Sequence, residues 1–439
     1  MAMPVQFLHG WILPACLKNA NIQGYNDLIH QAISLSEVNM RIGMMADLYK
    51  PHISGVTNYI VLNKTYLESQ GHEVYVFTFG DEQYRDDEPR IVRSPGLPLL
   101  ATGYVFSFRY STQARKLLRS MDVVHVHHPF LSGSLALRYC RPRGIPIVFT
   151  NHTRYDLYAQ AYVPGMPEAI SMTALQAYMP VFCRACDLVI SPSAGMRDVL
   201  QRFGVDVPVE VVPNGVDLKP FRQPIQPRER AEFGFNAEDV VLVYLGRLGP
   251  EKNLPFLLRS FAGTLQAYSQ SRLMIIGDGP ERENLEERVK QMGLDNYVRF
   301  TGQIPYDQVP KYITVADIFA TASVTEVHPF SVIEAMAAGL PVLGIQSPGV
   351  GDTVQDGETG YLAPEADLAS FTAKMVRLVI DRDCRRKMGA QARQAAEEYA
   401  IERTTQIVLR QYQKAIQLTA SRTKSPRARI TRWVDGFKR

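Results

Sequence analysis

The sequence predicts an α/β protein built from two doubly wound, Rossmann-like domains whose parallel sheets face a central cleft. Three observations support this prediction. The chain has 439 residues, which is too long for a single hydrophobic core. Short apolar runs recur at the spacing of β-α-β units. A segment containing proline and glycine, 212–217, separates two halves that show the same alternation.

The predicted strands are rich in Val, Ile and Phe and show little polar alternation, as expected when helices cover both faces of a sheet. In the first half they span 41–46, 73–79, 122–126, 146–150, 187–191 and 209–212. In the second half they span 240–245, 272–277, 297–301, 317–322 and 341–345. Helix signals fall between strands, such as Ser193 before 194–203 and Pro280 before 281–292.

These elements divide the chain into an N-terminal extension at 1–39, a first domain at 40–216 and a second domain at 217–400. Residues 401–439 supply a helix, expected near 401–419 to cross back to the first domain, and a basic tail. We hypothesise that the fold begins at Met40. Insolubility or inactivity of a variant that starts there would contradict this hypothesis.

Composition excludes several classes of protein. The net charge is +4, from 48 basic against 44 acidic residues, so we expect no nucleic-acid partner. The 5 cysteines lack the spacing of a disulfide framework, which favours a reducing, cytoplasmic location. No apolar run reaches the roughly 18–20 residues of a membrane span, and the first residues lack the basic start of a secretion signal.

The most specific local signal lies at 325–339, where Glu326 precedes a predicted helix and Glu334 lies in its second turn. Pro329 suits the first turn of that helix, and Phe330 and Ser331 then offer free backbone N–H groups to an anion. A diphosphate bound there would have a sugar on the side of Glu326 and a ribose on the side of Glu334. The alternative is an amphipathic helix with two solvated glutamates.

A second signal follows the strand at 240–245, where Arg247 and Lys252 flank a glycine turn. Two cations at a strand end can neutralise a departing diphosphate, as a divalent metal does in other transferases. A third, weaker signal is Gly55, which allows close approach of a phosphate after the first strand. The chain lacks a P-loop, and Arg282 stands where a dinucleotide turn needs its third glycine.

Histidines follow two strands of the first domain. His152 lies after the strand at 146–150 and should face the cleft, where it would contact the transferred sugar or the acceptor. His125, His127 and His128 have the density of a metal site, but strand alternation sends His128 to the opposite face from the other two. We therefore expect packing or acceptor contacts here, and no metal.

Taken in order, these motifs resemble the large retaining family of GT-B glycosyltransferases called family 4, over about residues 41–400. The matching segments are Gly55, 213–217, 246–247, 251–253, 277–280, 300–302, the Glu326/Glu334 pair and 356–360. The resemblance implies an acceptor-binding first domain and a second domain that binds a nucleotide-sugar, with no cofactor or essential metal.

The resemblance also implies roles for individual residues. Arg247 and Lys252 would contact the diphosphate of the donor, Glu334 the ribose and Glu326 the sugar, while His152 would lie at the reacting region. Gln303 would meet the nucleobase. One departure from the family pattern is the segment 327–329, Val-His-Pro, where relatives commonly have glycine, and it leaves the donor sugar open.

In the first domain, 124–130 and 151–158 resemble bacterial diacylglycerol glucosyltransferases and phosphatidylinositol mannosyltransferases. The stretch 97–119 is apolar and then basic, a pattern suited to an anionic lipid surface on the inner face of the plasma membrane. The residues assigned to membrane or acceptor contact are Arg109, Arg115, Lys116, Arg119 and His127. An internal helix with a solvated basic face is the alternative.

The leading hypothesis is a retaining transferase that moves glucose from UDP-glucose to diacylglycerol or a related lipid. The first alternative is a transferase that uses GDP-mannose or another nucleotide-sugar and a soluble or saccharide acceptor. The second is a protein that binds a nucleotide-sugar without turnover. Vesicle binding separates the lipid hypothesis from the first alternative, and an assay for turnover separates both from the second.

Overall fold

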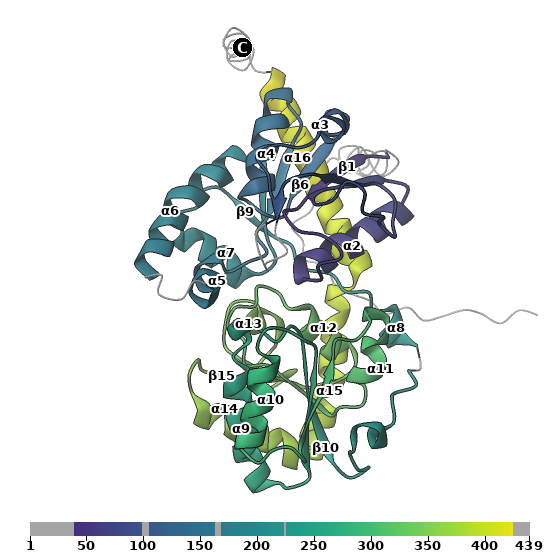
Figure 1. Cartoon of the computed structure of the whole chain (residues 1–439), viewed down its shortest axis with the longest axis vertical. Helices are drawn as coiled ribbons and strands as arrows, with labels where there is room; N and C mark the ends of the chain where they lie inside the picture. The colour runs from purple at the N-terminus through teal and green to yellow at the C-terminus, as the bar shows by residue number, and fades with distance from the viewer. Residues whose placement is uncertain (1–38, 99–104, 163–167, 224, 425–439) are drawn as a thin grey trace, which may run out of the picture. The chain divides into compact units, whose positions relative to one another are not determined.

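The structure is a computed structural model that describes residues 39–98, 105–162, 168–223 and 225–424 (Figure 1). Nearly all of the predicted N-terminal extension and the basic tail after residue 424 lie outside the described residues. Within the described part of the chain, no helix combines the length and apolar character that crossing a membrane requires.

The first domain is built on a seven-stranded parallel sheet with the order β3-β2-β1-β6-β7-β8-β9. Its strands are β1 (Arg41–Met45), β2 (Glu73–Phe79), β3 (Ile91–Ser94), β6 (Val123–Val126), β7 (Ile147–Thr150), β8 (Leu188–Ser191) and β9 (Val209–Val211). The six predicted strands of this half are therefore confirmed. The edge strand β3 was not predicted, because its polar sequence IVRS lacks the apolar run of a central strand.

Helices pack around this sheet: α2 (Gly55–Ser69), α3 (Thr112–Leu118), α4 (Leu131–Tyr139), α5 (Tyr155–Tyr162), α6 (Glu168–Ala185) and α7 (Ala194–Arg202). A short 3-10 turn, η1 (Arg141–Arg143), and an antiparallel pair, β4 (Leu97–Pro98) with β5 (Val105–Phe106), complete the described elements. Ser54 and Ser193 accept hydrogen bonds from backbone amides in the first turns of α2 and α7, so both helices begin at side-chain caps.

The second domain contains a six-stranded parallel sheet with the order β12-β11-β10-β13-β14-β15. Its strands are β10 (Val240–Leu245), β11 (Ser271–Ile276), β12 (Val298–Gly302), β13 (Ile318–Ala320), β14 (Val342–Ile345) and β15 (Gly360–Ala363). Again the predicted strands are confirmed, and the one that was not predicted, β15, lies at an edge of the sheet.

Separate apolar clusters fill the two faces of the second sheet, one beneath α9 and α14 and one beneath α12 and α15. The helices of this half are α8 (Lys219–Arg222), α9 (Leu254–Ala267), α10 (Arg282–Gln291), α11 (Val309–Ile313), α12 (Phe330–Ala337), α13 (Val350–Thr353), α14 (Leu368–Ile380) and α15 (Arg382–Ala396). The 3-10 turns are η2 (Arg230–Phe233), η3 (Pro250–Lys252), η4 (Tyr306–Gln308) and η5 (Glu397–Tyr399).

The last described helix, α16 (Ile401–Lys424), packs against α2, β6 and β7 (yellow in Figure 1). Tyr412 is fully buried, and its hydroxyl lies 2.7 Å from His125 Nδ1. The chain leaves the first domain through residues 212–217 and comes back to this crossing just before α16. There Val216 and Ala400 form a parallel bridge. Glycine is required at Gly215, because a Cβ there would lie 2.9 Å from the backbone Cα of Ile401 and 2.0 Å from Thr404 Oγ1.

Candidate active site

In the second domain, glycines form the ends of three neighbouring strands. The amide of Gly246, after β10, donates to Ile276 O, and that of Gly277, after β11, donates to Gly302 O on β12. A Cβ on Gly277 would lie 2.0 Å from Gly246 O, so the close approach of these turns requires glycine. Ligands of such parallel sheets bind outside the carboxyl ends of the strands, and the predicted cations follow this edge.

Lys252 and Glu326 form an ion pair at this edge. Lys252 ends η3, Glu326 lies in the loop before α12, and the distance from Lys252 Nζ to Glu326 Oε1 is 2.6 Å. Burial by itself would lower the pKa of Lys252, but the carboxylate of Glu326, with further effects from Tyr158 and Tyr244, raises it overall. Lys252 is therefore held as a cation in a largely dry setting, as a group that binds a diphosphate must be.

Arg247 lies in the turn between β10 and η3, and 45% of its side chain is exposed. Its guanidinium is 3.7 Å from the buried carboxylate of Glu251, and its carbonyl accepts a 3.0 Å hydrogen bond from the hydroxyl of Tyr244. The backbone is thus anchored while the charged end of the side chain still reaches solvent. This arrangement suits a cation that contacts a ligand.

Helix α12 begins one residue later than predicted. Pro329 is its N-cap and Phe330 its first residue, because Pro329 has extended backbone. The first intrahelical bond runs from the Ile333 amide to Pro329 O (3.3 Å), so the amides of Phe330 and Ser331 precede it. The expectation that these two amides open the helix and can meet an anion is unaffected by the shift.

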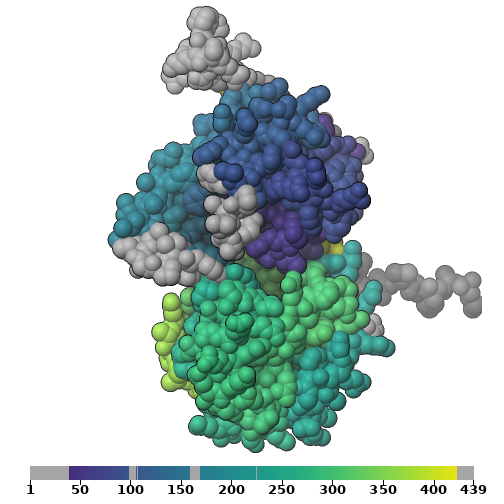
Figure 2. Space-filling view, in the orientation of Figure 1, coloured from purple at the N-terminus to yellow at the C-terminus, as the bar shows by residue number. Residues whose placement is uncertain are grey.

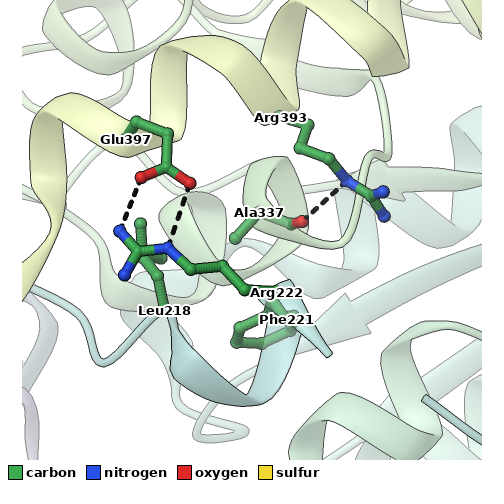
Figure 3. A pocket seen from close by; sticks show the side chains of 6 residues that line it. All are labelled: Leu218, Phe221, Arg222, Ala337, Arg393 and Glu397. Atoms are coloured by element: carbon green, nitrogen blue, oxygen red, sulfur yellow. Dashed lines mark hydrogen bonds and ion pairs between the residues drawn. The ribbon is translucent and has the colours of Figure 1, made fainter. Parts of the chain in front are cut away.

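The other end of α12 is fixed by an arginine. Arg393 of α15 donates to the carbonyls of Ala337 and Ala338, 3.2 and 2.9 Å away, where a helix end favours positive charge. Figure 3 shows Arg393 in the wall of a small pocket, beside the ion pair that Arg222 forms with Glu397. This pocket contains none of the predicted site residues, and of its lining side chains Arg393 bonds the carboxyl end of α12.

Glu334 points into the protein from the second turn of α12 and is 4% exposed. Burial raises its pKa to about 7, although a hydrogen bond from the Tyr306 hydroxyl lowers it in part. Tyr306 lies in η4, shortly after the exposed Gln303 at the end of β12. The predicted contacts for ribose and nucleobase therefore follow the carboxyl edge of the same sheet.

In the first domain, His152 follows β7 and is half-buried. Its Nε2 lies 3.1 Å from Nδ1 of His127, which follows β6 and is fully buried. The ring of Tyr59, from α2, lies 4.7 Å from the ring of His152. The strand alternation predicted for the histidines is confirmed, because the His125 and His127 rings lie 4.2 Å apart while His128 instead accepts a bond from the Asp47 amide.

Helices α2 and α5 of the first domain approach the second-domain site. A Cβ on Gly55 would lie 4.0 Å from the ring of Phe330. The pKa of Tyr158, in α5, is raised by burial, with smaller effects from Lys252 and Glu326. Tyr158 and Tyr306 were not predicted as site residues. A tyrosine within α5 or η4 has no local signal that separates it from ordinary packing.

Three of the five residues assigned to a membrane or acceptor surface are exposed. Phe108 and Leu97 are each 74% exposed, and Arg109, Lys116 and Arg119 are also exposed. The chain around residues 105–119 is coloured blue in Figure 2. Arg115 is half-buried and bonds Thr112. His127 is fully buried, so it is not part of an exposed membrane surface, and its contact with an acceptor stays a prediction. Residues 99–104 of the predicted apolar stretch lie outside the described residues.

No cluster of three or more His, Cys, Asp or Glu side chains suited to a metal ion occurs within the described ranges of the chain. The Asp-Arg-Asp segment at 381–383 has a structural role at its first position. Asp381 is the N-cap of α15, and its carboxylate accepts from the Cys384 amide at 2.9 Å. The expectation that no metal takes part remains a prediction.

Two parallel sheets covered by helices, with cations and a helix start at the carboxyl edge of the second, fit the class of glycosyltransferases with GT-B fold. The chain matches the family described as "Glycosyltransferase Family 4" over residues 53–220 and "Glycosyl transferases group 1" over residues 225–395. The chain belongs to this family of glycosyltransferases, as its similarity to a relative of known activity also shows.

That relative is the alpha-monoglucosyldiacylglycerol synthase of Streptococcus pneumoniae, which is 32% identical over 75% of this chain and 77% of its own length. A D-inositol 3-phosphate glycosyltransferase of Nocardia farcinica is 28% identical over 69% of each chain. The crystal structure of Anabaena Alr3699/HepE with UDP and glucose has a TM-score of 0.66 and 19% identity, and covers 86% of this chain and 100% of its own. That level of identity supports the fold alone.

Proposed function

We propose that this enzyme transfers glucose from UDP-glucose to diacylglycerol, with retention of anomeric configuration, at the inner face of the plasma membrane. The name of the Streptococcus pneumoniae relative supports the lipid acceptor. The exposed side chains of Phe108 and Leu97, with Arg109, Lys116 and Arg119 nearby in sequence, support docking to an anionic surface.

The observation that carries the proposal is the Lys252–Glu326 ion pair at the edge of the second sheet, with Arg247 in the preceding turn. In this proposal the diphosphate forms ion pairs with Lys252 and Arg247 and accepts hydrogen bonds from the amides at the start of α12. Glu326 then binds hydroxyls of the sugar, and Glu334 binds the ribose. Two cations stabilise the charge that develops on the leaving diphosphate.

The proposed chemistry is a substitution on one face of the sugar. The bond between the anomeric carbon and the diphosphate oxygen breaks, and a bond from the same carbon to the acceptor oxygen forms. The acceptor hydroxyl gives its proton to the leaving phosphate oxygen. No divalent metal is part of this proposal, because Arg247 and Lys252 supply the positive charge.

The test is transfer by the purified protein to diacylglycerol in anionic vesicles, with UDP-glucose, UDP-galactose and GDP-mannose as separate donors. We expect glucosyldiacylglycerol from UDP-glucose, and an α-linked product by proton NMR. A β-linked product would refute retention. Transfer from GDP-mannose alone would refute the proposed donor.

A second candidate is transfer to a soluble acceptor such as an inositol phosphate, which the name of the Nocardia farcinica relative favours. The same assay without vesicles, with D-inositol 3-phosphate as the acceptor, separates the two. Product in this arm together with none in the vesicle arm would support the second candidate.

A further inference from the structure

A group of aromatic rings lies behind His152 in the first domain. The rings of His125 and His127 are 4.2 Å apart, and those of His127 and His152 are 5.3 Å apart. The buried ring of Tyr59 contacts all three, with centroid distances of 6.0, 5.4 and 4.7 Å. His152 is the member of this group that is not fully buried, so the others form a wall behind it.

The two fully buried histidines, His125 and His127, differ in how many of their ring nitrogens have hydrogen-bond partners. His125 uses both nitrogens, Nδ1 at 2.7 Å from the Tyr412 hydroxyl and Nε2 at 2.7 Å from Thr150 Oγ1. His127 uses Nδ1 for the 3.1 Å contact with His152 Nε2, and its buried Nε2 has no hydrogen-bond partner among the described residues.

Both rings of the His127–His152 pair are neutral at physiological pH. Burial lowers the pKa of each well below the ordinary value, and neighbouring histidines lower both further. A neutral imidazole carries a single N–H, so one ring must donate to the other across the 3.1 Å contact.

The unpartnered nitrogen of His127 decides which ring donates. If His152 donated, His127 would keep its proton on Nε2, and a buried N–H would be left unsatisfied. If His127 donates from Nδ1, its Nε2 is a bare acceptor. Buried N–H groups without a partner are rarer in proteins than unsatisfied acceptors. The second arrangement is therefore favoured, and it puts the proton of His152 on Nδ1.

We infer that His127 is a positioning residue that holds His152 as its Nδ1–H tautomer, so that His152 offers a substrate oxygen a hydrogen-bond donor and does not act as a general base. This inference rests on the proposed function for the substrate that His152 meets. The preceding proposal that the acceptor proton passes to the leaving phosphate agrees with a histidine that has no free basic nitrogen toward the substrate.

The direct test is nitrogen-15 NMR of the histidine rings in the full-length protein without substrate, with His127→Asn and His152→Gln used to assign signals. We expect His152 to be protonated at Nδ1 and not at Nε2. Protonation at Nε2 would overturn the inference. Because no substrate is present, this result is independent of whether the proposed function is right.

Kinetics provides a second readout with a conservative rescue. His127→Leu removes the donor, and we expect kcat to fall about tenfold, the value of one neutral hydrogen bond, with the KM of the donor little changed. His127→Asn retains an N–H near the same place and should restore most of kcat. The control Tyr412→Phe removes a buried hydroxyl that bonds His125 and should leave kcat within about twofold.

Two outcomes would contradict a positioning role. If His127→Leu and His127→Asn lost the same share of activity, and that loss matched their loss of stability, the role of His127 would be structural. If neither variant changed kcat, the contact with His152 would have no role in turnover.

Discussion

Lys252 Nζ and Glu326 Oε1 lie 2.6 Å apart although 74 residues separate them in the chain. The side chains are only 13% and 22% exposed, so the pair is largely shielded from water. Removing one partner of such a shielded pair would leave the charge of the other uncompensated. The pair also places the residue proposed to bind the diphosphate, Lys252, next to the residue proposed to bind the sugar, Glu326.

Loss of either cation should abolish most turnover. We expect Arg247→Ala and Lys252→Ala each to lower kcat about 10²-fold, because a charged hydrogen bond contributes roughly 1.5–3 kcal/mol and more where charge develops in a dry site. The control is Lys290→Ala, which removes an exposed lysine from α10. Near-normal rates for both site variants would refute a role in leaving-group stabilisation.

Stability should depend on pH through Glu334. The folded protein holds this proton more tightly than the unfolded chain, since burial raises the pKa from 4.5 to about 7. Any stability from this proton is therefore fully present below about pH 4.5 and is lost as pH rises through about 7. The shift amounts to roughly 3 kcal/mol.

Chemical denaturation across this pH range checks the prediction. The unfolding free energy of the wild type should fall relative to that of Glu334→Gln as pH rises. Tyr306→Phe removes a hydrogen bond that lowers the pKa of Glu334, so the decline should move to higher pH in this variant. Parallel pH curves for the wild type and Glu334→Gln would contradict the assignment.

Vesicle binding should depend on the exposed side chains of the first domain. We expect Phe108→Glu and Leu97→Glu to weaken co-sedimentation with anionic vesicles at low salt. Each variant replaces an exposed apolar group with a negative charge, which the anionic lipid repels. The matched control is Ile380→Glu, at a 57% exposed position on α14 of the second domain. Equal binding by all three variants and the wild type would exclude this surface.

Transfer should survive removal of divalent metals. Arg247 and Lys252 are proposed to neutralise the diphosphate, so we expect EDTA to change the initial rate little. The measurement is the rate of glucosyl transfer with EDTA and after return of magnesium or manganese. Complete loss that metal reverses would mean that a cation takes part.

The central strands could be predicted from sequence because strands buried on both faces are continuous apolar runs. Two edge strands, β3 and β15, were not found, because β3 contains Arg93 and β15 is a short strand that begins at Gly360. The site turns were predictable for another reason. Glycines such as Gly246 and Gly277 have positive φ and closely packed neighbours, so the backbone itself demands them.

Contacts between distant segments were not predictable. Nothing local to His127 indicates that its ring bonds His152, and its motif was interpreted as packing or as a contact with the acceptor. Period-two alternation predicted which face His127 shares with His125 but not whether that face is covered. The answer depends on α2 and α16, since Tyr59 and Tyr412 from these helices cover the histidines.

The most direct measurement of the central claim is calorimetric titration of UDP and of uridine into the wild type, Arg247→Ala and Lys252→Ala. If these cations hold the diphosphate, the wild type should bind UDP much more tightly than uridine. Each variant should lose roughly 1.5–3 kcal/mol of that difference while its affinity for uridine stays the same. Unchanged affinity for UDP in both variants would contradict the account.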